Sequence, residues 1–323
     1  MVRSAGSGPV PIRVVFFGSS ASTFTARHFA ALLASPCHLA AVVDVPPTRR
    51  DTTNPLPDSL PDFAHVARGQ GIPVYEPASP NESQFVEALG RLEPDLFLAT
   101  GYALILKAKL LGVPRLLAAN FHASLLPEYR GKHPVFWTLR GDERWAGLTV
   151  HAMDPGIDTG DILYQVKVRT RRDDTVSSLY NRIMDQSVGL VERLVVDAEL
   201  GSVPRRLQPE GSGSYFSSIT DDDFRLRWHW PAEKIRRFVT ITPGRCYVDV
   251  KQQPVYFSNA EPERSDKPSV PGTLLRVGRT RAVVAAGQGA ISSSRVQVPG
   301  HDVESFAGFC RRVGLEPGDR LET

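Results

Sequence analysis

Cysteine is scarce in this sequence, because Cys37, Cys246 and Cys310 are the only three among 323 residues. Their odd number and wide spacing fit neither a disulfide framework nor paired metal ligands. Most histidines also lack cysteine or acidic partners at metal-ligand spacing, and we predict that they are surface or packing residues: His28, His38, His65, His133, His151, His229 and His301. We therefore expect a protein of a reducing compartment that binds no metal.

Long apolar runs are missing from the start of the chain. The first nine residues are polar overall, and the apolar run that follows, Ile12 to Phe17, is too short for a secretion signal or a membrane span. An excess of one charge sign is missing as well, since 38 basic and 35 acidic residues give a net charge of +3. We predict a cytoplasmic protein whose charge permits nucleic acid or acidic substrates without requiring them.

The glycine pattern of a dinucleotide-binding loop is also absent. Gly18-Ser19-Ser20 follows the first predicted strand, but no second or third glycine stands at the required spacing. The segment is predicted to be an ordinary turn between a strand and a helix, and it indicates no NAD site.

Strands and helices alternate up to residue 200. We predict strands at 12–17, 39–45, 72–75, 96–100, 117–122, 148–153 and 162–168, and helices at 25–33, 62–70, 82–91, 107–111, 134–140 and 175–200. Five prolines between Pro46 and Pro61 predict an irregular surface loop. The alternation predicts an α/β fold with a Rossmann-like, mostly parallel sheet that is covered on both faces.

The composition changes after residue 207. Residues 208–214 have the composition of a linker. A helix near 232–239 then precedes short strands at 247–250, 255–257, 272–277, 281–285 and 294–298, which indicates a small β-rich barrel. We therefore predict a first domain over residues 1–207, a linker over 208–214 and a C-terminal domain over 215–323.

The stretch from Ala119 to Gly131 is the most informative part of the sequence. Side chains alternate faces along a strand, so Asn120 and His122 point the same way, while Phe121 points into the opposite layer. The Pro- and Gly-containing loop that follows puts the pair at a strand's carboxyl end, where open α/β sheets bind ligands. An amide and an imidazole side by side can stabilise a tetrahedral oxyanion.

A glycine-rich turn between two later strands adds three carboxylates: Asp154, Asp158 and Asp161. Each of them is also a typical turn residue. Asp158 is a candidate to orient His122, to keep it charged, or to help remove a proton from an attacking amine.

Two motifs carry a resemblance to a known family. N-x-H-x-S-L-L-P-x-x-R-G begins at Asn120, and D-x-G-x-D-T-G-D-I begins at Asp154. In this order they resemble the signature of the 10-formyltetrahydrofolate-dependent formyltransferases. The likeness runs from Arg13 to Leu321, because 228–239, 242–244 and 271–273 resemble the OB-like C-terminal domain of the branches that formylate methionyl-tRNA and amino sugars. The glycinamide ribonucleotide branch lacks that domain.

The resemblance implies roles for particular residues. The family's catalytic Asn, His and Asp fall on Asn120, His122 and Asp158, and Arg130 and Lys132 are candidates for substrate binding. The implied folate pocket consists of Leu104, Ile105, Leu106, Ser124, Leu125, Leu126, Pro127, Asp154, Gly156 and Ile157. In the implied reaction, an amine attacks the formyl carbon of 10-formyltetrahydrofolate and no metal takes part.

The acceptor is the open part of this hypothesis. The segment Pro46 to Thr53 has two arginines and no glycine, whereas methionyl-tRNA formyltransferases carry a glycine- and arginine-rich segment that touches the acceptor stem. We therefore predict that the acceptor is a small molecule, either an amino sugar or a biosynthetic intermediate. Formylation of methionyl-tRNA is the alternative. Hydrolysis of formyltetrahydrofolate and a non-catalytic folate or RNA binder are further alternatives.

Basic residues of the C-terminal domain bear on the choice of acceptor. Arg276, Arg279, Arg281 and Arg295 give this domain a basic character. Aromatic residues are not interleaved among them, so the sequence indicates no stacking platform for single-stranded nucleic acid.

Overall fold

The computed structural model describes residues 11–50, 55–57, 60–265 and 269–321. The chain divides into two compact units. The first comprises Met1–Thr138, Arg144–Arg169 and Leu179–Ser217, and the second comprises Leu139–Glu143, Thr170–Ser178 and Ser218–Thr323. Two short segments from the middle of the sequence thus belong with the C-terminal unit.

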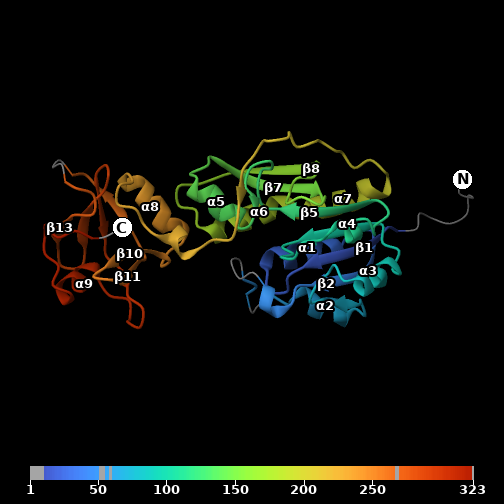
Figure 1. Ribbon diagram of the computed structural model, residues 1–323, viewed down its shortest axis with the longest axis horizontal. Coiled ribbons are helices and arrows are strands. Elements are labelled where there is room, and N and C mark those ends of the chain that lie inside the picture. Colours follow the sequence, from blue (N-terminus) through green and yellow to red (C-terminus); the bar gives the residue numbers. More distant parts are fainter. Residues whose placement is uncertain (1–10, 51–54, 58–59, 266–268, 322–323) are drawn as a thin grey trace, which may run out of the picture. The chain divides into compact units, whose positions relative to one another are not determined.

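A seven-stranded sheet forms the centre of the first unit, with the strand order β3-β2-β1-β4-β5-β7-β8 (Figure 1). The strands are β1 (Arg13–Gly18), β2 (His38–Asp44), β3 (Val74–Tyr75), β4 (Leu96–Thr100), β5 (Leu117–His122), β7 (Trp145–Ala152) and β8 (Ile162–Arg169). The first five run parallel, and β7 is antiparallel to both β5 and β8. The predicted mostly parallel sheet is confirmed.

Helices cover both faces of this sheet. They are α1 (Thr23–Leu33), α2 (Phe63–Gly69), α3 (Ser83–Gly90), α4 (Ala108–Leu111), α5 (Pro134–Arg140), α6 (Val176–Ser187) and α7 (Gly189–Glu199). On one face, Phe16 of β1 contacts Phe29 of α1 and Phe63 of α2. On the other face, Phe17 shares an apolar cluster with Val86 of α3. Because neighbouring residues of one strand serve opposite faces, the almost fully apolar β1 fits a strand buried on both sides.

The single helix predicted over 175–200 is wrong, because it is interrupted at Val188. The Ser187 hydroxyl donates to the Met184 carbonyl and also contacts Nε2 of His28, which lies on α1. A hydroxyl that bonds back to the preceding turn competes with the helical hydrogen bonds and bends the helix. Gly189, which begins α7, offers little resistance to such a break.

The proline-rich loop after β2 begins with a short 3-10 helix, η1 (Pro47–Arg49). Arg50 then turns back and pairs with buried Asp44 at 2.8 Å. Part of the predicted loop, residues 51–54 and 58–59, lies outside the described residues.

The second unit is rich in short strands. Its elements are η2 (Asp221–Phe224), α8 (Ala232–Ile241), β10 (Cys246–Val250), β11 (Gln253–Phe257), β12 (Glu261–Glu263), β13 (Leu274–Val277), β14 (Ala282–Ala285), β15 (Ala290–Ser293), β16 (Val296–Gln297) and α9 (Phe306–Arg312). The strands form two small sheets, β10-β11-β16 and β12-β15-β14-β13. The predicted β-rich C-terminal region is confirmed, although β12, β15 and α9 were not predicted.

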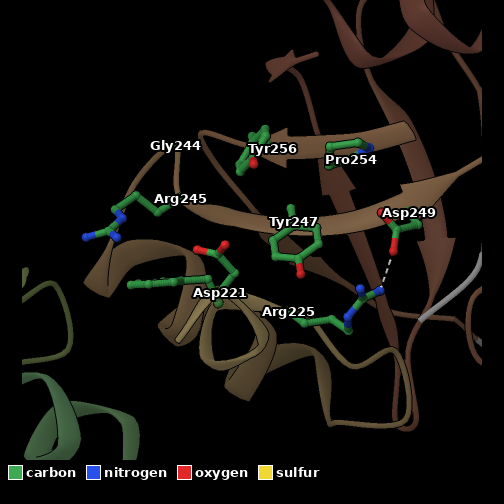
Figure 2. A pocket seen from close by; sticks show the side chains of 9 residues that line it. Asp221, Arg225, Gly244, Arg245, Tyr247, Asp249, Pro254 and Tyr256 are labelled. Carbon is green, nitrogen blue, oxygen red and sulfur yellow. Dashed lines mark hydrogen bonds and ion pairs between the residues drawn. The ribbon is translucent and has the colours of Figure 1, made fainter. Parts of the chain in front are cut away.

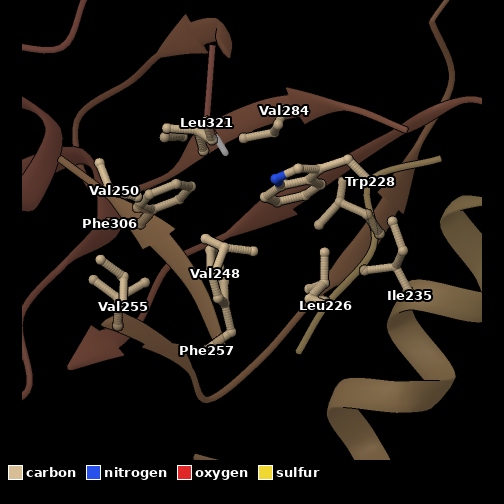
Figure 3. Packing of buried hydrophobic residues seen from close by; sticks show 14 of the residues in the cluster. Leu226, Trp228, Ile235, Val248, Val250, Val255, Phe257, Val284, Phe306 and Leu321 are labelled. Atoms are coloured by element: carbon tan, nitrogen blue, oxygen red, sulfur yellow. The ribbon is translucent and has the colours of Figure 1, made fainter. Parts of the chain in front are cut away.

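The core of this unit gathers around Trp228, which is 1% exposed. Figure 3 shows its indole ring near Val284, and Leu226, Val248, Phe257 and Phe306 belong to the same cluster. Inward residues of β10 and β11 alternate with outward ones, as expected for hairpin strands with one buried face. Across the described ranges of both units, no helix has the length and apolarity that a membrane span requires.

Candidate active site

The candidate site lies where β5, β7 and the turn after β7 meet. Asn120 and His122 occupy the carboxyl end of β5, as predicted, and β7 runs antiparallel beside them. Asp158 lies in the turn between β7 and β8. The structure therefore brings together the three residues that the sequence analysis named as catalytic candidates.

Asp158 is the centre of the hydrogen-bonding network. Its Oδ2 accepts a 2.8 Å hydrogen bond from the Gly131 backbone N–H and lies 3.5 Å from Nδ1 of His122. Its Oδ1 lies 3.2 Å from Nε2 of His151. Burial alone raises the pKa of the Asp158 carboxyl, but His122, His151 and the Gly131 N–H outweigh burial and hold that pKa well below its usual range. The carboxylate is therefore charged at neutral pH.

The His122 ring and the Asn120 amide both lie next to this carboxylate. Nε2 of His122 donates to the Tyr129 carbonyl at 2.8 Å, while Nδ1 faces Asp158. Oxygen atoms therefore face both nitrogens of the ring. The Asn120 amide nitrogen lies 3.2 Å from His151 and 3.5 Å from Asp158. The site thus combines a fixed imidazole, a primary amide and a carboxylate.

His151 belongs to this network, so its prediction as a surface or packing residue is wrong. It stands directly opposite Asn120 in the β5–β7 register and is 2% exposed. Its Nδ1 donates to the Ala152 carbonyl at 2.8 Å, which turns Nε2 toward Asp158 and Asn120. The sequence shows that His151 lies on a strand, but only the register of β5 against β7 places it opposite Asn120.

The loop after β5 is fixed by hydrogen bonds to its neighbours. Thr149 of β7 accepts from the Leu126 N–H at 3.0 Å and donates to the Ser124 carbonyl at 2.7 Å. The Ser124 hydroxyl donates to the Glu128 carbonyl, and the Leu126–Pro127 peptide bond is cis. This loop therefore holds the Tyr129 carbonyl and the Gly131 N–H in place for the catalytic candidates.

Residues of the predicted linker form a wall of the site. The Gln208 amide donates to the carbonyls of Asp158 and Gly160 at 2.8 and 2.7 Å. The hydroxyl of Ser214 accepts from the Tyr129 N–H at 2.9 Å. The strands β6 (Arg130–Gly131) and β9 (Tyr215–Phe216) then pair in parallel. A segment with linker composition can still make such contacts. The predicted boundaries at 207/208 and 214/215 stay a prediction.

The two candidate substrate-binding residues differ. The Arg130 guanidinium donates to the Gln208 side chain at 2.7 Å and to the Ser212 carbonyl at 3.1 Å, which gives it a structural role in the wall. Lys132 is exposed, and its backbone N–H donates to the Phe216 carbonyl. Its ammonium group has no carboxylate within ion-pair distance among the described residues.

Two of the candidate folate residues are large exposed hydrophobics. Ile105 is 63% exposed and Ile157 is 43% exposed. Asn81 fixes the first segment, because its side chain donates to the Ile105 carbonyl and accepts from the Lys107 N–H, both at 2.8 Å. Leu106 and Met153 share one apolar cluster, which links this segment to the end of β7.

The remaining candidate folate residues lie in two ordered loops. Asp154 accepts from the Thr159 hydroxyl at 2.7 Å and from the Gly156 N–H at 3.1 Å, which closes the turn before Asp158. Ser124 and Leu126 are buried, whereas Leu125 and Pro127 are partly exposed. Exposed apolar side chains next to ordered backbone suit a flat heterocycle with a hydrogen-bonding edge. No group of three or more metal-ligating side chains occurs among the residues that the structure describes.

Both the N-terminal and the C-terminal part of the chain match known protein families. Residues 12–194 match the formyl transferase family, and residues 218–314 match the formyl transferase C-terminal domain. The methionyl-tRNA formyltransferase of Pseudomonas entomophila is 31% identical over 298 residues, which are 92% of this chain and 94% of the relative. That of Ectopseudomonas mendocina is 31% identical over 317 residues, which are 96% of this chain and 98% of the relative.

Solved structures of similar fold include sugar-modifying enzymes. The N-formyltransferase from Helicobacter canadensis, solved with folinic acid and dTDP-3-aminofucose, has a TM-score of 0.63 at 15% identity and covers 88% of this chain and all of its own. The sugar 3N-formyltransferase WlaRD, solved with dTDP and 5-N-formyl-THF, has a TM-score of 0.62 at 14% identity, covering 90% of this chain and 99% of its own. At these identities the likeness concerns the fold alone. The two family matches and the full-length similarity at 31% identity show that the chain belongs to the formyltransferase family and is an enzyme that transfers a formyl group.

Proposed function

We propose that this enzyme transfers the formyl group of 10-formyltetrahydrofolate to the amino group of methionyl-tRNA. The observation that carries this proposal is the similarity to methionyl-tRNA formyltransferases, which extends over more than nine tenths of both chains and includes the C-terminal domain. The small-molecule acceptor that the sequence analysis preferred has weaker support. Its structural neighbours are similar in fold only.

Asn120 and His122 are the groups that stabilise charge in the proposed reaction. When the amine attacks the formyl carbon, the formyl oxygen becomes an oxyanion. The Asn120 amide donates a hydrogen bond to it, and the His122 imidazole, which the Tyr129 carbonyl and Asp158 fix in place, lies beside it as the second stabilising group. Removing one such donor costs about 10²- to 10³-fold in rate.

Asp158 controls protons in the same step. The attacking amine must lose a proton, and the departing folate nitrogen must gain one. The charged Asp158 carboxylate fixes the His122 ring and assists the movement of the proton from the amine to the leaving nitrogen. His151 is a positioning residue, because it holds both Asp158 and Asn120 in the orientation that this step needs.

The formyl donor is proposed to bind along Leu104 to Leu106 and the turn from Asp154 to Ile157. The exposed side chains of Ile105 and Ile157 would contact the faces of the pteridine ring. The backbone of these two segments would bind its polar edge. This arrangement brings the formyl group to the carboxyl end of β5, where Asn120 and His122 lie.

Purified enzyme with 10-formyltetrahydrofolate and separate acceptors tests the proposal. We expect formylated methionine on initiator methionyl-tRNA, no formylated product from a dTDP-amino sugar, and little folate turnover without an acceptor. Formylation of the amino sugar but not of methionyl-tRNA would restore the small-molecule hypothesis. Equal turnover without any acceptor would indicate a formyltetrahydrofolate hydrolase.

A pair of variants tests the site. His122→Asn should lose at least about 10²-fold in turnover number. His38→Asn changes an exposed histidine at the start of β2 and should behave like the unchanged enzyme. Similar activity of both variants would remove His122 from the mechanism.

A further inference from the structure

A pocket lies on the outer face of the β10–β11 hairpin in the C-terminal unit. It has a volume of about 420 Å³, within the range of small-ligand sites. Its walls come from η2, from the turn before β10 and from both hairpin strands (Figure 2). It is lined by Asp221, Phe224, Arg225, Gly244, Arg245, Tyr247, Asp249, Pro254 and Tyr256. We call it the hairpin pocket.

The strand register brings two tyrosines together in this pocket. Tyr247 of β10 stands directly opposite Tyr256 of β11, and their ring centroids are 5.6 Å apart. Their neighbours Val248 and Val255 point into the core and are fully buried. The alternation of faces therefore forces both rings outward, where they remain partly exposed. Among the described residues, neither tyrosine hydroxyl has a hydrogen-bond partner.

The two arginines of the pocket differ in whether a carboxylate pairs with them. Arg225 pairs with Asp249 at 2.5 Å and lies 4.9 Å from the centre of the Tyr247 ring, so its charge is balanced within the wall. The exposed Arg245 lies over the Phe224 ring at 4.0 Å. No carboxylate of the described ranges lies within ion-pair distance of its guanidinium. Arg245 therefore offers a cation with free donors at the edge of an aromatic surface.

The position of Arg245 is set by the turn before β10. Gly244 has φ +77, and its N–H donates to the Phe257 carbonyl at 3.1 Å. The N–H of Arg245 donates to the Thr242 carbonyl at 3.1 Å. The turn thus anchors the backbone at Arg245 to β11 and to the C-terminal end of α8.

Paired aromatic rings and a free guanidinium that line one pocket match the chemistry of an unstacked nucleotide. A base stacks on aromatic rings whatever its identity, and arginine binds phosphate oxygens in a bidentate manner. The paired Asp249 and the tyrosine hydroxyls can bind the polar edge of a base. The positive and negative charges of the pocket balance, so stacking would supply most of the affinity.

We propose that the hairpin pocket binds one unpaired nucleotide of the tRNA acceptor, with its base on Tyr247 and Tyr256 and its phosphate on Arg245. This inference rests on the proposed function. The expectation from the sequence concerned only Arg276, Arg279, Arg281 and Arg295. The proposed site instead uses the hairpin pocket, where Arg225 lies over Tyr247 and Arg245 lies over Phe224.

Binding of unacylated initiator tRNA to the full-length enzyme tests the inference. Tyr247→Leu should weaken binding roughly 5-fold to 100-fold, the range expected for one stacked base. Tyr247→Phe keeps the ring and should bind within about twofold of the unchanged enzyme. Arg245→Gln should lower the dependence of affinity on salt by the equivalent of about one phosphate contact. Arg279→Gln, which removes an exposed arginine elsewhere in the same unit, is its matched control and should leave affinity near normal.

Formylation kinetics separate this inference from the proposed function. In Tyr247→Leu we expect a raised KM for methionyl-tRNA and an unchanged kcat, with unaltered thermal unfolding. Formylation by the unchanged enzyme together with normal binding by Tyr247→Leu would overturn the inference alone. Failure of the unchanged enzyme to formylate methionyl-tRNA would overturn the proposed function. Tyr247-dependent binding of free nucleoside monophosphates without any effect on tRNA would also contradict the inference.

Discussion

Replacement of Asp158 by asparagine should affect activity and stability in different ways. The asparagine oxygen can still accept from the Gly131 N–H, and its amide group then faces Nε2 of His151. A neutral His151 ring that keeps its Nδ1–H bond to Ala152 can accept this hydrogen bond. The variant should therefore fold, but it lacks the negative charge that lies 3.5 Å from Nδ1 of His122.

The expected loss of activity follows from that charge. A group that moves protons in the transition state contributes about 10²- to 10⁴-fold, so Asp158→Asn should lose turnover within that range. The matched control is Asp161→Asn, in the same turn, whose carboxylate contacts only Arg205 at 3.4 Å among the described residues. Single-turnover formylation of both variants gives the comparison. An Asp158→Asn rate within about tenfold of the control would refute the role given to this carboxylate.

The stability effect has a definite sign. The pKa of Asp158 is lower in the folded enzyme than in the unfolded chain, so its contribution to stability is present above the unfolded value of about 3.9. The contribution disappears as pH falls through the lower folded value. A carboxyl shifted in this direction by its folded-state partners contributes on the order of 2 kcal/mol at neutral pH. Urea unfolding should show Asp158→Asn less stable by about this amount near pH 7, with the difference shrinking below about pH 4. A difference that is constant with pH would contradict the assignment.

Three further results are expected. His151→Ala should lower kcat about 10- to 100-fold, by analogy with other residues that orient a reactive group, while His151→Gln, which can still donate to Asp158, should recover part of the loss. Gly131→Ala should destabilise the enzyme in thermal unfolding and impair turnover, because a Cβ there would overlap the Phe216 carbonyl at a φ of +92. Burial raises the pKa of Cys37 and Cys310 to about 11 and that of Cys246 to about 12, so a thiol reagent near neutral pH should label none of them in the folded enzyme and all three after unfolding.

Local sequence patterns predict much of the first unit. The strands at Leu96–Thr100 and Leu117–His122 and the helix at Pro134–Arg140 were predicted with the bounds that the structure gives them. Each has a local signal, either a short apolar run with turn residues after it or a proline at a helix start. The break at Val188 has no such signal, since it depends on a bond between Ser187 and His28 of another helix.

In the candidate site, too, some residues follow from local sequence patterns and others only from tertiary contacts. Strand alternation alone pairs Asn120 with His122, and the two-motif resemblance adds Asp158. His151 was missed because its role depends on how β7 is aligned with β5. The wall from Gln208 to Phe216 was missed because its composition is that of a linker. Its role comes from contacts with segments that are distant in the sequence: Gln208 bonds to the Asp158 carbonyl, and β9 pairs with β6. The rest of the site thus depends on the β5–β7 register and on long-range contacts, and local sequence patterns predict neither.

Formylation of initiator methionyl-tRNA by the purified enzyme with 10-formyltetrahydrofolate decides the proposal that methionyl-tRNA is the acceptor. We expect N-formylmethionine on the tRNA and one tetrahydrofolate for each formyl group transferred, with Asp158→Asn nearly inactive and Asp161→Asn active. Formylation of a small amine in preference to methionyl-tRNA, or an active Asp158→Asn enzyme, would contradict it.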